Sequence, residues 1–350
     1  MHKEAFTILL VTTGGTIAGH SQKNDTRGKT LHREAWESLS QSLLAEGAPH
    51  EQVSIEVAAL CDLDSTELGP EHWEQLRLQV RGKAEEYDAF VITHGTNTLG
   101  YTAAALAFGL GPLHFPVILT GAQFPIGHPD SDGPGNLREA LLATLLPDLC
   151  GVFISFGGSL LPGVLASKLS DQDKAAFTWP GRDVVGTFED SGWQIESPVL
   201  ARFGWSGSAP HEVPAAPLPM QEILVIRLHP GMAGSGIASL MRSGQYRALC
   251  IMAFGSGDLP ASWQPALTEL REQGIPVLIH SQVPFATASM TQNPPGKDLL
   301  DAGLAIPAGN MSPETALVKL AWLLTQGFSY EQVFAGMRQN ICGEVQPPRQ

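Results

Sequence analysis

Strand-length apolar runs alternate with helix-length amphipathic segments through the N-terminal half of the chain. This alternation constrains the fold more than any other feature of the sequence. The segments that predict strands are 8–17, 55–60, 89–93, 116–120 and 151–156, and those that predict helices are 34–44, a helix opening at Pro70, 101–110 and 136–145. A repeated strand–helix order is typical of a mostly parallel sheet with helices on both faces. We therefore expect an α/β fold.

The alternation of predicted strands and helices ends between Glu196 and Met220, in a segment rich in proline and glycine. Such a composition is typical of a linker. Beyond it, strand-like runs at 222–228, 248–254 and 276–280 are each followed by a candidate helix, and 313–324 predicts a last one. We therefore expect three parts: a larger N-terminal catalytic α/β domain (1–195), a Pro/Gly-rich linker (196–221) and a smaller C-terminal α/β domain (222–350).

Charge and composition exclude several classes of protein. The formal net charge of −14 argues against nucleic-acid and anionic-membrane partners, because phosphates require a basic surface. The four cysteines are scattered without a CxxC pair, so neither a zinc site nor a disulfide framework is expected. The N-terminus does not have the pattern of a signal peptide, and no apolar run reaches the roughly 18 residues that span a bilayer. These features predict a cytoplasmic protein. We expect no cofactor.

Two predicted strands end in Gly-Thr, namely the runs 8–17 and 91–98. The carboxyl ends of parallel strands form the edge where ligands bind in open α/β sheets. A threonine after a strand is commonly only a helix cap, but Ser65-Thr66-Glu67 adds more hydroxyls than capping requires. Threonine acts as an acyl-transfer nucleophile when a base removes its proton. A glycine-rich turn can hold an oxyanion, and Lys168, if kept neutral, is a candidate base.

Several blocks resemble the bacterial-type L-asparaginase/glutaminase family, in particular its cytoplasmic type I branch. The most specific are Thr13-Gly14-Gly15-Thr16-Ile17 and His94-Gly95-Thr96-Asn97-Thr98. Similar blocks are found at 64–73, 120–123, 131–133, 228–232, 255–257 and 310–314. The resemblance covers nearly the whole chain. It implies two α/β domains, a site at the strand ends of the larger one, no metal, and a homodimer or homotetramer.

The same resemblance implies a role for each site residue. Thr16 would be the nucleophile, while Thr96, Asn97 and Lys168 would stand at the positions that handle protons. Ser65 would hold the substrate α-carboxylate, and Ala122 would contribute backbone contacts to the amide. The substrate-binding residues that we expect are Gly15, Ser65, Thr66, Glu67, Gly95 and Ala122.

Two departures from the family pattern bear on the substrate. Asn97 replaces the aspartate of the family block and so lacks its negative charge; Glu67 or Asp132 would then have to supply one. The family tyrosine on the loop after Thr16 is also absent from Gly19 to Arg33, where the candidates to replace it are His20, Asp25 and Lys29.

The predicted activity is hydrolysis of L-asparagine to L-aspartate and ammonia through an acyl-threonine. Two alternatives use the same scaffold: a catalytically weakened amino-acid-binding or regulatory protein, and an amidase for a different small amide. The net charge disfavours the tRNA-dependent amidotransferase branch. The sequence does not decide between asparagine and glutamine.

Overall fold

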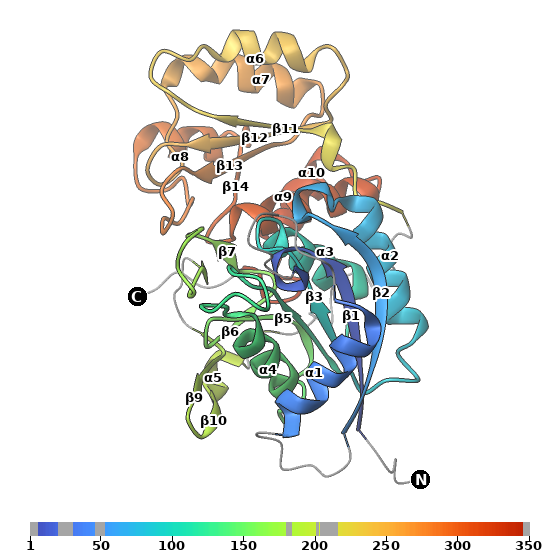
Figure 1. The fold of residues 1–350 in the computed structure, drawn as a ribbon. Helices are drawn as coiled ribbons and strands as arrows, with labels where there is room; N and C mark the ends of the chain where they lie inside the picture. The colour runs from blue at the N-terminus through green and yellow to red at the C-terminus, as the bar shows by residue number, and fades with distance from the viewer. Residues whose placement is uncertain are drawn as a thin grey trace. The chain divides into compact units, whose positions relative to one another are not determined.

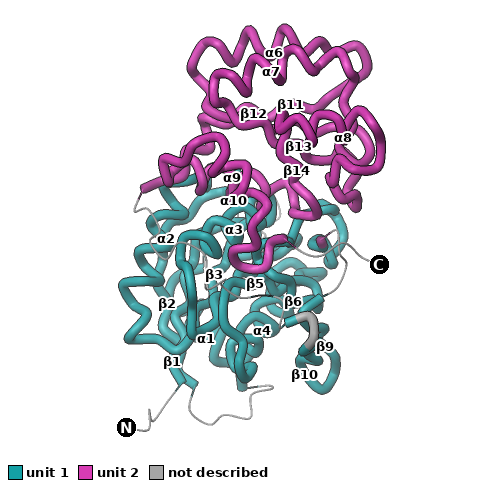
Figure 2. The backbone as a smooth tube through the Cα atoms, turned by 180° about the vertical axis from the view of Figure 1, so that it is seen from behind, with its two compact units in different colours: residues 1–178, 182–215 teal, residues 179–181, 216–350 magenta. Residues whose placement is uncertain are grey.

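The computed structural model describes residues 6–19, 31–45, 53–179, 184–200, 203 and 216–345. The chain divides into two compact units (Figure 2): residues 1–178 with 182–215 form unit 1, and residues 179–181 with 216–350 form unit 2. Each unit has its own sheet and its own hydrophobic core. The predicted α/β class with two domains of unequal size is thus confirmed.

Unit 1 is built on an eight-stranded sheet with the order β10-β9-β6-β5-β4-β3-β1-β2. Its strands are β1 (Phe6–Gly14), β2 (Val53–Leu63), β3 (Ala89–Thr93), β4 (Pro116–Thr120), β5 (Gly151–Phe156), β6 (Ser159–Pro162), β9 (Gly186–Glu189) and β10 (Gly192–Ile195). The five strands from β2 to β5 pair in parallel, whereas β6, β9 and β10 pair antiparallel at one end. All four carboxyl ends of β1 to β4 therefore lie at one edge.

Helices cover both faces of this sheet (Figure 1). They are α1 (Arg33–Ala45), α2 (Pro70–Gly82), α3 (Leu99–Leu110) and α4 (Gly133–Ala143). Helices α1 and α4 pack together over the face that carries Ile8, Val91 and Ile118, and α2 packs against α3 on the other side. The predicted helix start at Pro70 and its buried face are confirmed. The buried side chains of that face include Trp73, Leu76 and Val80.

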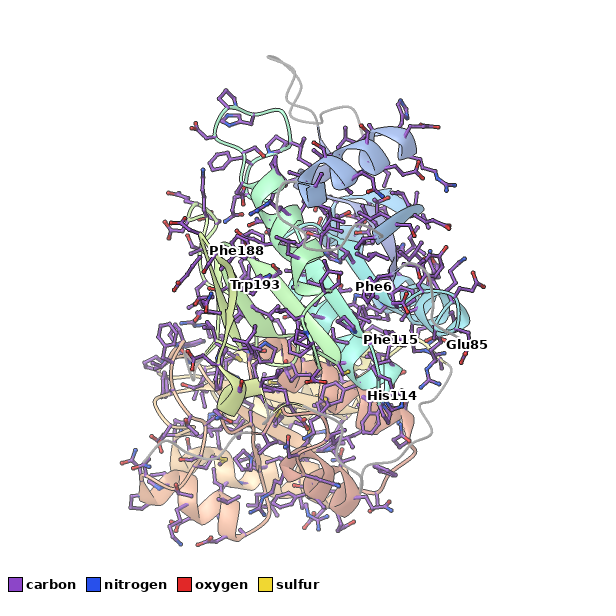
Figure 3. All side chains as sticks on the ribbon, turned by 90° about the horizontal axis from the view of Figure 1, so that it is seen from below. Phe6, Glu85, His114, Phe115, Phe188 and Trp193 are labelled. Carbon is purple, nitrogen blue, oxygen red and sulfur yellow. The ribbon has the colours of Figure 1, made fainter. Side chains whose placement is uncertain are left out.

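The antiparallel end of the sheet was not predicted from the sequence. Strands β6, β9 and β10 have four residues each, and the hairpin of β7 (Ser167–Lys168) and β8 (Phe177–Thr178) has two in each strand. Such short runs carry too little periodicity to be recognised. Phe188 and Trp193 meet edge to face across the β9–β10 hairpin, with 5.3 Å between ring centroids (Figure 3). A short helix, α5 (Ser197–Leu200), falls within the segment predicted as a linker.

Unit 2 contains a four-stranded parallel sheet with the order β11-β12-β13-β14. Its strands are β11 (Ile223–Arg227), β12 (Ala248–Ala253), β13 (Val277–Ser281) and β14 (Ile306–Pro307). Its helices are α6 (Gly234–Met241), α7 (Gln264–Glu272), α8 (Pro294–Asp301), α9 (Pro313–Thr325) and α10 (Tyr330–Arg338), with 3-10 turns at η3 (Met220–Glu222) and η4 (Ala261–Trp263). The strands and helices predicted beyond residue 222 are confirmed. Strand β14 and helix α10 were not predicted.

A fully buried ion pair fixes the end of the described chain to unit 2. Lys319 of α9 lies 2.6 Å from Glu344, and both side chains are completely buried. The Glu344 carboxylate also accepts hydrogen bonds from the backbone amides of Ile341 and Cys342. Of the helices in the described ranges, none combines the length and the apolar character needed to cross a membrane.

Candidate active site

The ends of the central strands of unit 1 are brought together by glycines. A Cβ atom on Gly15, after β1, would lie 2.5 Å from the Cα atom of Gly95, after β3. A Cβ atom on Gly95 would lie 2.8 Å from the side chain of Ser65, after β2. One on Gly121, after β4, would lie 2.4 Å from the carbonyl oxygen of His94. Real Cβ atoms do not approach other atoms so closely, so these backbones can meet only at glycine. The two Gly-Thr blocks and the Ser65 turn therefore share one edge of the sheet.

Hydrogen bonds between the strand ends fix this arrangement. The Thr13 hydroxyl donates to the carbonyl oxygen of Thr93 at 2.9 Å, and the Thr98 hydroxyl donates to that of Ser65 at 2.6 Å. The buried His94 ring lies between the Gly95 carbonyl oxygen, 2.7 Å from Nδ1, and the Thr102 hydroxyl, 2.9 Å from Nε2. Burial lowers the pKa of His94 to about 4, so the ring is neutral at neutral pH. His94 therefore serves to fix the turn.

Lys168 joins Thr96 and Asn97. Its Nζ lies 2.7 Å from the Thr96 hydroxyl oxygen and 3.0 Å from Asn97 Oδ1. Strand β7 carries Lys168 to this place because it pairs with β8, with Lys168 opposite Phe177. Burial lowers the pKa of Lys168, and the negative charge of Asp171 opposes that shift. A partly desolvated amine against a threonine hydroxyl is a suitable proton acceptor.

Thr16 is the first residue of a 3-10 turn, η1 (Thr16–Ala18), directly after the close contact at Gly15. Gly15 has φ of +75°, a conformation that favours glycine. Ile17 and Ala18 are buried in the core of unit 1, which holds the turn in place, while Thr16 itself is exposed. The predicted nucleophile is thus accessible at the same edge as the neighbouring hydroxyls.

Three of the predicted substrate-binding residues form a second 3-10 turn, η2 (Ser65–Glu67). Asp64 caps it by accepting hydrogen bonds from the backbone amide and the hydroxyl of Thr66, at 2.9 and 2.8 Å. The Thr66 hydroxyl is therefore engaged within the turn. Ser65 is only 2% exposed and contacts Gly95, whereas Glu67 is exposed.

The loop after β4 places Gln123 beside Thr96. Ala122 is fully buried. Gln123 Oε1 accepts from the Thr96 hydroxyl at 3.5 Å, and its Nε2 donates to the carbonyl oxygens of Ser170 and Asp173 at 3.1 and 3.2 Å. The role of Gln123 was not predicted, although it ends the block 120–123. A residue that links two loops, as Gln123 does, has no periodic pattern in the sequence by which it could be recognised.

The Asp132 carboxylate is engaged in hydrogen bonds within the protein. It accepts hydrogen bonds from the backbone amides of Gln123 and Phe124, at 3.0 and 2.9 Å, and from Nδ2 of Asn136 at 3.0 Å. Only 9% of the residue is exposed. His20, Asp25 and Lys29, the three candidates on the loop after Thr16, lie outside the described residues.

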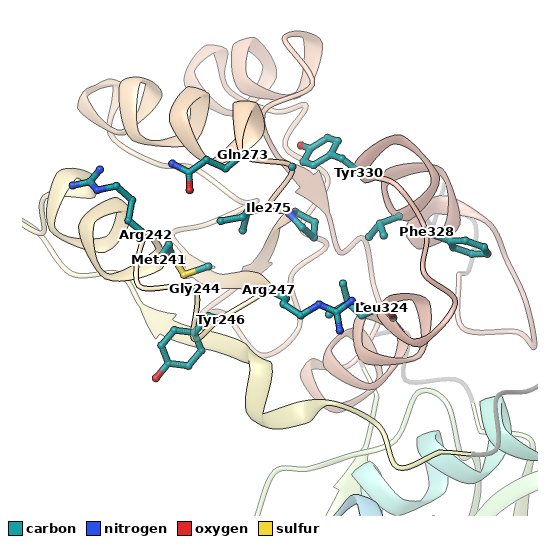
Figure 4. A pocket seen from close by; sticks show the side chains of 13 residues that line it. Met241, Arg242, Gly244, Tyr246, Arg247, Gln273, Ile275, Leu324, Phe328 and Tyr330 are labelled. Carbon is teal, nitrogen blue, oxygen red and sulfur yellow. Dashed lines mark hydrogen bonds between the residues drawn. The ribbon is translucent and has the colours of Figure 1, made fainter.

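A cavity of about 350 Å³ lies in unit 2 (Figure 4). Its charged side chains already have partners, since Arg247 pairs with Glu222 at 2.9 Å and Arg242 pairs with Glu269. Tyr330 donates its hydroxyl hydrogen to the carbonyl oxygen of Gly303. Within the described part of the chain no group of His, Cys, Asp or Glu side chains is arranged to hold a metal ion. The residues at the strand ends of unit 1 are therefore the better candidate for the active site.

Comparison with known proteins identifies relatives of the chain. The family model described as "Asparaginase, N-terminal" matches residues 7–200, and that described as "Glutaminase/Asparaginase C-terminal domain" matches residues 222–337. An L-asparaginase of Thermococcus kodakarensis is 31% identical over 97% of this chain and 98% of its own length. The structure of L-asparaginase I from Vibrio cholerae matches with a TM-score of 0.81 at 28% identity, over 98% of this chain and all of that one. A glutamyl-tRNA(Gln) amidotransferase component of Pyrococcus horikoshii is 28% identical over 97% of this chain and 77% of its own length.

Proposed function

The chain belongs to the asparaginase family of amidohydrolases, and we propose that its site in unit 1 converts L-asparagine to L-aspartate and ammonia. One observation carries the proposal: Lys168 Nζ lies 2.7 Å from the Thr96 hydroxyl in a partly buried setting, at the edge that also holds Thr16. Such a pair can accept a proton from the hydroxyl or water that attacks the amide.

In this mechanism Thr16 Oγ1 attacks the side-chain amide carbon of the substrate. The proton of its hydroxyl passes to the Thr96–Lys168 pair, and the C–N bond breaks as the leaving nitrogen takes a proton to become ammonia. Backbone N–H groups of the glycine-rich turn would stabilise the oxyanion. Water then attacks the acyl-threonine ester, giving L-aspartate and restoring the Thr16 hydroxyl.

Ammonia release from asparagine by the purified chain tests the proposal. Thr16→Ala should lower the rate by about 10⁴–10⁶-fold, the loss typical of a removed nucleophile. Thr268→Ala, in α7 of unit 2, is the matched control that removes the same atoms from a hydroxyl bonded within its own helix. Unfolding by urea should be the same for both variants. Full activity in Thr16→Ala would exclude it as the nucleophile, and no ammonia from the unmodified chain would favour a binding or regulatory protein.

Asn97 favours a second candidate, an amidase for a small amide without an α-ammonium group. Its amide contacts Lys168 but carries no negative charge to receive an ammonium. A panel of amides with and without the α-amino group separates the two candidates. Faster turnover of the amides that lack it would favour the second. The same panel compares asparagine with glutamine.

A further inference from the structure

Lys168 is carried by a hairpin that is too short to fix its own position. Strands β7 and β8 have two residues each, and the turn 169–176 joins them. A hairpin of two strands is marginally stable by itself. Nζ of Lys168 nevertheless lies 2.7 Å from the Thr96 hydroxyl oxygen, and a proton can pass between them only while this distance is kept. Contacts from outside the two strands must therefore hold the hairpin.

Gln123 fastens the β7–β8 turn at two points. Its Nε2 donates to the carbonyl oxygens of Ser170 and Asp173, at 3.1 and 3.2 Å. The turn is also closed on itself, because the Ser170 hydroxyl oxygen accepts from the backbone amides of Gln172 and Asp173, at 3.2 and 3.0 Å. One side chain from the loop after β4 thus binds both ends of a closed turn.

The other end of the same amide faces Thr96. Gln123 Oε1 accepts from the Thr96 hydroxyl at 3.5 Å, which is longer than an ordinary O–H···O hydrogen bond. This contact therefore contributes less than the two bonds to the turn. The reverse orientation of the amide would place its oxygen against two carbonyl oxygens, and an oxygen cannot donate to them. The turn thus determines which end of Gln123 lies beside Thr96.

A second contact holds the turn without Gln123. A Cβ atom on Gly157, between β5 and β6, would lie 2.5 Å from the carbonyl oxygen of Lys174 and 2.9 Å from the Cα atom of Ala175. The two turns are therefore packed backbone to backbone. The Gly157 amide donates to Asn136 Oδ1 at 3.0 Å, which fixes the β5–β6 turn. Loss of the Gln123 bonds should consequently loosen the β7–β8 turn without detaching it.

We propose that Gln123 is a positioning residue: its amide holds the β7–β8 turn so that Lys168 stays within hydrogen-bond distance of Thr96. This inference rests on the proposed function, in which Lys168 and Thr96 accept the proton. The role requires no contact between Gln123 and the substrate. A shift of reacting groups by about 1 Å can slow a reaction roughly 100-fold, so loosening the turn should affect kcat.

The variant Gln123→Met in the full chain tests this role, because it keeps the length of the side chain and removes both the donor and the acceptor without adding charge. Amide hydrogen exchange of segment 167–178, followed by mass spectrometry, should become about 10- to 30-fold faster, as expected for two lost hydrogen bonds of ordinary strength. For asparagine, kcat should fall about 10- to 100-fold while KM stays within about twofold.

Gln172→Met is the matched control, since it makes the same substitution on an exposed side chain of the same turn. It should change neither the exchange of segment 167–178 nor kcat. Exchange in β12 of unit 2 serves as the internal reference for general destabilisation and should be the same in all three proteins.

Four results would overturn the proposal: unchanged exchange in segment 167–178, faster exchange in β12 as well, faster exchange of the hairpin with unchanged kcat, or a raised KM with unchanged kcat. The last would indicate a direct contact with the substrate. If the unmodified chain releases no ammonia, the proposed function fails and exchange alone decides. Faster exchange confined to segment 167–178 would then still support the hold on Lys168, and unchanged exchange would refute it.

Discussion

The Gly95→Ala variant tests whether the close approach of strand ends assembles the site. The added methyl group would lie 2.8 Å from both Cβ and Oγ of Ser65 and 3.3 Å from the Cα atom of Gly15. Ordinary contacts begin near 3.4 Å, so the Ser65 turn would have to move by about 0.6 Å if Gly95 stayed in place. Gly95 does not have a positive φ; the effect is therefore steric alone.

A displacement of this size affects activity more than stability. Overpacking of a filled site typically costs about 1–3 kcal/mol, which a folded chain of this size can tolerate. Misplacement of reacting groups by about 1 Å can cost roughly 100-fold in rate. Since Gly95 precedes Thr96 and contacts both Ser65 and Gly15, we expect kcat/KM for asparagine to fall about 10- to 100-fold, with unfolding destabilised by about 1–3 kcal/mol.

Ammonia release and urea unfolding measure the two effects in parallel. Gly135→Ala is the control, because a Cβ atom on this exposed residue of α4 meets no atom within 4 Å. It should leave kcat/KM unchanged and should not destabilise the fold, since alanine is the better helix former. If Gly95→Ala kept kcat/KM within twofold of the unmodified chain, the contact between the strand ends would not set the geometry of the site.

Two further predictions concern titration. Lys168→Met should lower turnover about 10²–10⁴-fold, the range of a lost general base. In the unmodified chain turnover should rise with pH through the Lys168 pKa, which burial places below its ordinary 10.5; a pH–rate profile that is flat there would contradict a neutral lysine. For His94, the folded pKa of about 4 lies below the ordinary 6.5, so its stabilising contribution is complete above pH 6.5 and is lost as pH falls toward 4. Urea unfolding should show a loss of about 3 kcal/mol over that window, and His94→Gln should remove this component.

The strands and helices of the parallel core could be predicted because they are long and strongly patterned. The predicted runs 89–93, 116–120 and 151–156 coincide with β3, β4 and β5. Each is buried on both faces and reads as a continuous apolar run. The short antiparallel strands could not be predicted in this way, since a strand such as β7, with two residues, is defined by its partner across the turn and not by its own sequence.

The residues of the candidate site also divide into those that the sequence pattern predicts and those that it does not. Thr16 and Thr96 could be selected because each follows a recognisable strand and a glycine, and parallel topology brings such ends together. The contact of Lys168 with Thr96 depends on a hairpin that local pattern does not reveal. The sequence therefore marked Lys168 only as a candidate base, and the resemblance to a known family grouped it with Thr96. The link through Gln123 and the structural role of Asp132 depend on hydrogen bonds between loops, which no spacing rule encodes.

The Asn97→Asp variant tests the electrostatic logic of the whole site. Asn97 Oδ1 already lies 3.0 Å from Lys168 Nζ, so a carboxylate could take its place with little change in shape. A charge-assisted hydrogen bond is roughly twice as strong as a neutral one, and the new charge would raise the Lys168 pKa. If the substrate is an α-amino acid, aspartate binding to the Thr16→Ala protein should tighten about tenfold. Binding of succinate, which is aspartate without its ammonium group, should not tighten. No gain would mean that the charge comes from another group or that no ammonium is bound beside Asn97. In the second case an amide without an α-amino group would become the better substrate.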